Sequence, residues 1–264
     1  MKATRKIIMS ILIAFFLLPS FAQEVKTKTV SSGNFLEIFT IDKKSKLRIG
    51  EYLKIDTKSG DTLISGTFKD NLKTGIWKYN SKDSKPWISY DYDKKVLSRL
   101  SDQVSKSDSF SIRKNDTFIS EKVDTPPLYI GYKDEVMNTL GSNIRPPVQI
   151  LETGKPVVAV ASFVVDIKGN TKGFQILKTS SKDINSSIFE AFKKLDGEWS
   201  PAIFNGQPVD SEVFIVFDIK PMGVSSIIPK IPNSIVVQVL YYGVKRAPVV
   251  IGTSTMFGSF PRRR

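Results

Sequence analysis

Cysteine and histidine are both absent from this chain of 264 residues. Without cysteine there are no disulfide bonds, thiolate zinc sites, iron–sulfur clusters or cysteine nucleophiles. Without histidine, the Ser-His-Asp mechanism, histidine-ligated metals and the commonest general base are excluded. These two absences remove most of the enzyme mechanisms that a sequence can reveal. We therefore expect a protein that is not an enzyme and that needs no cofactor and no metal.

The first residues have the layout of a secretory signal peptide. Basic residues precede an apolar run over 7–18, and Ser20 and Ala22 are the small residues before Gln23. This pattern predicts cleavage after Ala22, with a signal peptide over 1–22 and a mature protein that is periplasmic or secreted. The alternative is an uncleaved membrane anchor, but the apolar run is shorter than the ~20 residues of a membrane span.

The chain is strongly basic, with a formal net charge of +13. An exported protein rarely meets nucleic acid, so we expect no nucleic-acid partner. The basic residues either bind an anionic component of the envelope or only keep the protein soluble. They are scattered along the chain apart from a short block at 262–264, which favours solubility.

Residues 23–123 have the texture of an antiparallel β meander. Apolar runs of four to eight residues alternate with breaks rich in Gly, Asn, Asp, Ser and Lys, as at 57–61 and 69–75. Short runs with turn signals and no 3.6-residue periodicity are typical of hairpin-linked strands. We therefore predict a β-rich segment over this range.

One part of this segment, residues 64–79, resembles a MORN-type repeat. In that family, a strand with a glycine and an aromatic residue is followed by a turn and a second strand with the pattern Gly-x-Trp. Gly66, Phe68, Gly75 and Trp77 fit this pattern. The resemblance implies a scaffold or a binding surface and not a catalytic site. The alternative is a generic hairpin in which Phe68 and Trp77 share one face.

The prolines at 126 and 127 predict a stiff linker over 124–127, followed by a second domain over 128–221. Within this domain we expect Trp199 to be buried against the second helix. Periodicity and turn residues predict, in order, a helix, two strands, a second helix and a last strand. These elements cover residues 133–144, 157–166, 173–178, 184–195 and 209–219.

Four motifs give residues 128–221 a resemblance to the C-terminal domain of TonB. They are Arg145-Pro146-Pro147 after the first helix, Phe163-Val164-Val165-Asp166 before the turn Lys168-Gly169-Asn170, Trp199-x-Pro201-Ala202 after the second helix, and Asn205-Gly206-x-Pro208-Val209 before the last strand. The family's energy transducer also has a membrane helix and a Pro-rich spacer. We find no such spacer and expect the signal peptide to be removed, so an energy-transducing role stays open.

The resemblance implies a function and a binding site. TonB C-terminal domains recognise partner segments by β-augmentation in outer-membrane transport, in which an extended segment adds to the edge of a sheet. For this chain the resemblance implies a protein partner in the cell envelope, such as an outer-membrane receptor. The implied edge is in the last strand and consists of Glu212, Val213, Phe214, Ile215, Val216 and Phe217.

Together these patterns predict an α+β fold class: an N-terminal antiparallel β meander with a MORN-like hairpin, a small αββαβ TonB-like domain, and a β-prone tail over 222–264. We expect residues 235–242 of the tail to pair with the sheet next to residues 212–217, because proteins often cover an exposed edge. The alternative is a disordered tail. A second apolar run at 247–251 would add a further hairpin.

The alternative function is that of a periplasmic glycan hydrolase. Such an enzyme needs two carboxylates ~5–10 Å apart in a cleft, one of them with a raised pKa. Asp91, Asp93 and Glu121 are the carboxylates that would have to converge. A solvated charged face is the simpler interpretation of Asp91 and Asp93, since nothing in the sequence marks a cleft there.

Overall fold

The computed structural model describes residues 24–81, 86–100 and 109–242, which form two compact units. Unit 1 takes its residues from 1–106, 128–135 and 197–200, and unit 2 takes the remainder. The chain therefore leaves unit 1, returns to it twice, and ends in unit 2. The predicted signal peptide and the apolar run at 247–251 lie outside the described residues.

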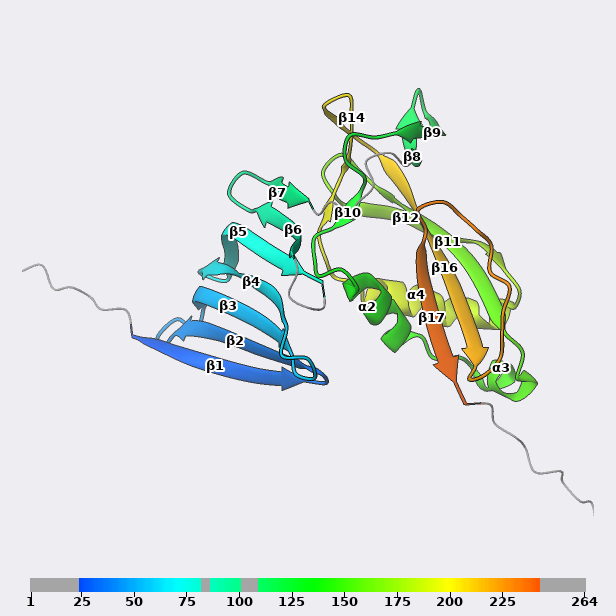
Figure 1. Ribbon diagram of the computed structural model, residues 1–264, viewed down its shortest axis with the longest axis horizontal. Helices are drawn as coiled ribbons and strands as arrows, with labels where there is room; N and C mark the ends of the chain where they lie inside the picture. Colours follow the sequence, from blue (N-terminus) through cyan, green and yellow to red (C-terminus); the bar gives the residue numbers. More distant parts are fainter. Residues whose placement is uncertain (1–23, 82–85, 101–108, 243–264) are drawn as a thin grey trace, which may run out of the picture. The chain divides into compact units, whose positions relative to one another are not determined.

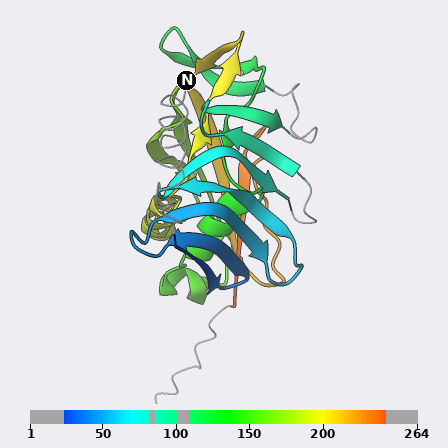
Figure 2. The same cartoon turned by 90° about the vertical axis from the view of Figure 1, so that its left-hand side faces the viewer.

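Unit 1 is built on a seven-stranded antiparallel meander in which each strand pairs with its neighbours in sequence (Figure 1). Figure 2 shows these strands following one another from blue to green. Asp70 and Asn71, both with positive φ, form the turn that joins the MORN-like pair of strands. The strands are β1 (Val25–Ser32), β2 (Phe35–Asp42), β3 (Arg48–Asp56), β4 (Thr62–Lys69), β5 (Leu72–Asn80), β6 (Pro86–Asp91) and β7 (Val96–Leu100), with β10 (Leu128–Tyr129) and β13 (Trp199–Ser200) forming a separate pair.

Aromatic side chains dominate the core of unit 1. The rings of Tyr52 and Trp77 stack 5.4 Å apart, and Phe68 meets the Trp77 ring edge-on at 4.9 Å. Gly66 makes this arrangement possible, because a Cβ there would lie only 2.2 Å from the indole of Trp77. Trp77 Nε1 donates a hydrogen bond to the carbonyl oxygen of Thr67. The glycine and the tryptophan of the MORN-like pattern are thus matched parts of one packing contact.

Unit 2 contains a six-stranded sheet in the order β12-β11-β16-β8-β9, with β17 also paired to β16. All of these pairs are antiparallel except β16 with β17, which is parallel. The strands are β8 (Ser109–Lys114), β9 (Thr117–Lys122), β11 (Val157–Val165), β12 (Thr171–Thr179), β16 (Ser211–Pro221) and β17 (Ile235–Tyr241), and β14 (Ala202–Phe204) and β15 (Gln207–Val209) form a small hairpin.

Different elements lie against the two faces of this sheet. On one face, Phe192 of α4 (Asn185–Lys193) packs on Phe163, and Gly141 of α2 (Glu135–Asn143) approaches Val237. On the other face lies the crossover segment that connects β16 to β17, residues 222–234. The remaining helical elements are α3 (Val148–Thr153) and the short 3-10 helix η3 (Lys182–Ile184).

The predicted α+β fold class is wrong. Strands contain 54% of the described residues and helices 13%, and the chain forms large antiparallel sheets. The predicted αββαβ domain is wrong as well, because β8, β9 and β17 lie outside residues 128–221 and yet belong to the same sheet. The physical reason is strand pairing: without β8 and β17, the side of β16 that does not face β11 would expose unpaired backbone groups.

The boundaries between the two compact units also differ from the predicted boundary at 124–127. Thr125, in the predicted linker, forms a β-bridge with Ile203 of unit 2. The neighbouring Asp124 accepts a hydrogen bond from the backbone N–H of Gly206. The residues after the two prolines, 128–135, belong to unit 1. The proline pair thus lies between the bridge at Thr125 and β10, where the chain passes from unit 2 to unit 1.

Candidate functional site

The predicted binding edge, residues 212–217, lies in an interior strand of unit 2. One side of this part of β16 pairs throughout with β11. On its other side, Glu212 pairs with Ser111 of β8, and the chain from Ile215 onward pairs with β17. These residues therefore do not form an open edge.

The side chains of this segment are also largely enclosed. Val213, Ile215, Val216 and Phe217 are buried, while Glu212 and Phe214 are half-buried. The Ser111 hydroxyl donates to Glu212 Oε2 at 3.2 Å. A partner that bound here would first have to remove a strand of this protein.

The strand that covers this segment is the one expected from the tail. β17 pairs in register with β16 over seven residues, from Ile215 opposite Ile235 to Pro221 opposite Tyr241. The expectation that this part of the tail pairs with the sheet is therefore confirmed. Tyr241 secures its end, because the phenol donates to the carbonyl oxygens of Ile150 and Lys155.

The outer side of β17 is a backbone edge near the predicted site, and Gly141 of α2 approaches this side at the carbonyl oxygen of Gln238. Within residues 24–242 as described, no strand pairs with this side of β17. Its sequence, IVVQVLY, has no charged residue and consists mainly of β-branched and aromatic residues. Val236 and Leu240 are 39% and 50% exposed. Long, uncharged edges of this kind readily accept a further strand.

The carboxylates of the hydrolase alternative serve other purposes in the described residues. Asp91 accepts hydrogen bonds from the backbone N–H groups of Asp93 and Lys94, so it stabilises the turn after β6. The Lys94 N–H lowers the pKa of Asp91, which is the opposite of what a general acid needs. Glu121 belongs to unit 2 and pairs with Lys114.

Next to the MORN-like region, unit 1 holds a network of partly buried hydroxyl groups. Tyr92 donates to Glu198 Oε2 at 2.6 Å, and its oxygen lies 2.8 Å from that of Tyr79. Lys73 donates to the same Tyr92 oxygen at 2.9 Å. Burial raises the pKa of Tyr92, and the neighbouring Tyr79 and Glu198 raise it further, so the phenol remains a donor. These groups satisfy one another, which is typical of a scaffold.

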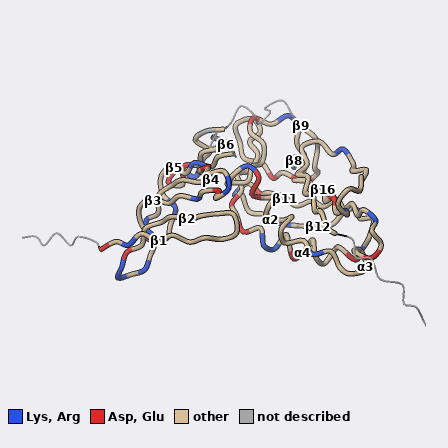
Figure 3. The backbone as a smooth tube through the Cα atoms, turned by 60° about the horizontal axis from the view of Figure 1, so that its bottom comes forward, with Lys and Arg blue, Asp and Glu red and all other residues tan. Residues whose placement is uncertain are grey.

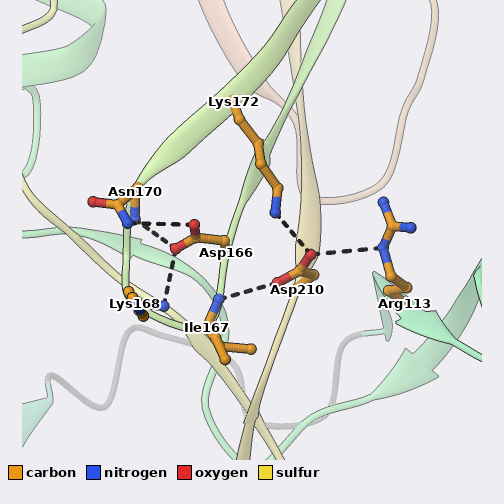
Figure 4. A network of polar contacts seen from close by, with 7 residues as sticks. All are labelled: Arg113, Asp166, Ile167, Lys168, Asn170, Lys172 and Asp210. Carbon is orange, nitrogen blue, oxygen red and sulfur yellow. Dashed lines mark hydrogen bonds and ion pairs between the residues drawn. The ribbon is translucent and has the colours of Figure 1, made fainter.

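A second polar network holds the turn between β11 and β12 in unit 2 (Figure 4). Asp166 accepts from the backbone N–H groups of Lys168 and Asn170. Burial raises the pKa of Asp166, but these donors lower it more, so the net shift is downward. Asp210 accepts from the Ile167 N–H and contacts Lys172 at 3.1 Å. The network therefore fixes a turn, and Asp210 carried no sequence signal for this role.

Charged side chains are dispersed over both units. Figure 3 shows basic positions spread over strands and turns of both units, with acidic positions among them. No group of three acidic side chains in the described ranges is placed to hold a metal ion. Helices in the described part of the chain are too short or too polar to cross a bilayer.

Compared with known proteins, the chain matches no family model, no curated protein and no solved structure. The likeness to TonB C-terminal domains and to MORN-type repeats thus stands on the motifs quoted above.

Proposed function

We propose that this protein is an exported, non-enzymatic binding protein of the cell envelope, whose unit 2 recognises an extended segment of a partner protein by β-augmentation. The observation that carries the proposal is the outer side of β17, an uncharged edge strand on a sheet with a well-packed core. The resemblance of residues 128–221 to TonB C-terminal domains supports the same mode of recognition. An outer-membrane receptor is the kind of partner that this resemblance implies.

Addition to β17 is favoured over displacement of β17. Val237, Val239 and Tyr241 are buried in the sheet, and Gln238 donates to Asp218 Oδ2. Exposing three such side chains would cost roughly 5–9 kcal/mol, at about 1.5–3 kcal/mol for each. A partner segment would have to recover this free energy before it gained any affinity. Addition to the outer side leaves these contacts intact.

The edge also indicates the chemistry of the segment that fits it. Main-chain hydrogen bonds supply the affinity in β-augmentation, and side-chain contacts supply the selectivity. Val236 and Leu240 project from β17 as partly exposed apolar side chains. A segment with β-branched or aromatic residues at alternate positions would cover both. We therefore expect the partner to present an extended, β-prone stretch.

The first test changes the edge without changing the core. Lysine on an edge strand disfavours pairing, so Val236→Lys/Leu240→Lys should lower partner affinity at least about tenfold. Leu177→Lys is the matched control, because Leu177 is 48% exposed on β12 at another edge of the same sheet. Partner retained from envelope extract by the mature protein is identified by mass spectrometry, purified and titrated against each variant.

The second test separates addition from displacement. The chain has no cysteine, so Val216→Cys/Val236→Cys, at paired positions of β16 and β17, introduces one disulfide that locks β17 in place. We expect the oxidised and reduced forms to bind equally and the complex to protect β17 amides from exchange. Loss of binding on oxidation, or protection confined to another element, would refute the proposed site.

A further inference from the structure

The face of the unit 2 sheet opposite α4 carries a pocket of about 560 Å³. Val158 and Val160 of β11 form its floor, the end of β12 forms one wall, and the crossover segment forms the other. The side chains that the crossover contributes are Ile227, Ile228, Pro229 and Ile231. The volume lies in the range of small-molecule sites, which are mainly apolar with a few polar groups that set orientation.

The crossover wall is held in place by a buried polar contact. Ser226 donates to Asp218 Oδ1 at 2.5 Å, and Lys220 contacts Asp218 Oδ2 at 2.7 Å. Next to this anchor, the side chain of Ile227 is 97% exposed. An isoleucine held at the rim of an apolar pocket presents hydrocarbon surface that an occupant would cover.

The two hydroxyl groups along the pocket wall form hydrogen bonds within the protein, whereas Lys178 is exposed to solvent. The Thr179 hydroxyl donates to the Ser181 carbonyl oxygen, and the Ser180 hydroxyl accepts from the Val158 N–H. Lys178 lies opposite Val160, so its side chain is on the pocket face. Among the residues that the structure describes, its ammonium group has no carboxylate partner within ion-pair distance.

The charged residues in the stretches that line the pocket have one sign, and the nearby Asp218 carboxylate is already paired with Lys220. The three stretches that line it, 158–160, 178–180 and 227–231, contain two charged residues, Lys178 and Lys230, and both are basic. An apolar cavity with an unpaired ammonium at its wall complements a hydrocarbon chain that ends in an anion. We propose that this pocket binds a free long-chain carboxylate, with the chain against Val158, Val160 and the crossover and the carboxylate paired with Lys178.

This proposal does not depend on β-augmentation, because no residue of β17 lines the pocket. Its test is calorimetric titration of the mature protein with dodecanoate below its micellar concentration. Dodecanol and dodecyltrimethylammonium are the comparison ligands, since they share the chain and differ in the head group. We expect saturable binding of dodecanoate, with about fivefold weaker binding of the alcohol and weaker binding still of the cation.

Two lysine variants locate the head group. Lys178→Met should weaken dodecanoate about fivefold and leave dodecanol unchanged, because only the carboxylate uses the ammonium. Lys194→Met, at the end of α4, is the matched control and should bind both ligands as the parent does. Methyl chemical shifts of Val158, Val160, Ile228 and Ile231 should move on titration in the parent and in the Lys178→Met protein.

Three results would overturn the proposal. They are the absence of saturable binding, equal affinity of the parent for dodecanoate and dodecanol, and unchanged dodecanoate affinity in Lys178→Met. Shifts that move only methyl groups away from the pocket would also overturn it, whatever the affinity.

Discussion

At the scale of single residues, Gly66 and Trp77 show most directly how the MORN-like pattern acts. The pattern places a glycine on β4 and a tryptophan on β5, and the structure shows that the indole occupies the space of the missing side chain. Both residues were identified from the sequence. Their mutual contact was not, because the resemblance describes spacing along the chain and not which atoms touch.

Gly66→Ala should lower the free energy of unfolding by about 1–3 kcal/mol, since the new methyl group forces the buried Trp77 ring or the backbone to move. Gly141→Ala in α2 is the control. Its Cβ would meet only ordinary contacts at 3.7 Å, and alanine is favoured over glycine in a helix by about 0.5–1 kcal/mol. Chemical denaturation measures both variants. Equal effects of the two substitutions would contradict this account of Gly66.

The burial of Trp199 was predicted, but the residues that surround it were not. It is 5% exposed, as expected, and its ring meets Tyr129 edge-on at 5.5 Å. Trp199 lies in β13, where it pairs with Tyr129 of β10, and it belongs to unit 1. The aromatic residues of α4, Phe189 and Phe192, pack on Phe174 of β12. Periodicity identifies a buried side chain but does not say which sheet it joins.

At the scale of elements, the crossover segment depends on Asp218. Burial raises the pKa of this carboxyl, but hydrogen bonds from Lys220, Ser226 and Gln238 lower it more, so its pKa in the folded protein is below the usual 3.8. A lowered folded pKa stabilises the protein above about pH 4, and this contribution is lost as the pH falls below 3.8 towards the folded value.

Asp218→Asn should therefore reduce the free energy of unfolding by about 2 kcal/mol at pH 7, as expected for hydrogen bonds to a charged group. The difference from the parent protein should shrink as the pH falls below 3.8, because the parent then loses the same charge. Denaturation of both proteins between about pH 2.5 and pH 7 measures this difference in the free energy of unfolding. Asp116→Asn, in the exposed turn after β8, controls for the loss of one negative charge. A difference that stays constant with pH would contradict the role of Asp218.

Helix α3 shows where local signals were incomplete. The pair Pro146-Pro147 was interpreted only as the end of the preceding helix. In the structure, α2 ends at Asn143 and a new helix begins at Val148, directly after the second proline. Proline is well suited to a helix start because its missing N–H is not needed there. The same residues can therefore end one helix and precede another.

At the scale of the whole molecule, the first expectation concerns export. The mature protein should begin at Gln23, because Ala22 completes the cleavage pattern of the signal peptide. Mass spectrometry of the protein recovered from the periplasm or the medium gives its N-terminal residue. Recovery of residues 1–22 still attached, in a membrane fraction, would contradict cleavage and support the anchored alternative.

The division of the chain also belongs to this scale. Unit 1 draws on three separate stretches, including 128–135 and 197–200 from the TonB-like region. The sequence alone predicted a division at 124–127, because two prolines and a change of texture coincide there. Prolines mark a break in local structure, but they do not say whether the chain later returns to pack against an earlier segment.

Periodicity and turn residues were enough to locate most strands and both long helices. Composition was enough to exclude cysteine and histidine chemistry. These features are local, so the sequence contains them directly. The order of strands in unit 2 was decided only in three dimensions. Strand pairing joins β8, β16 and β17 across long stretches of chain, and it depends on matching edges and buried faces that no local period encodes. For that reason the predicted edge became an interior strand, and β17 became the edge.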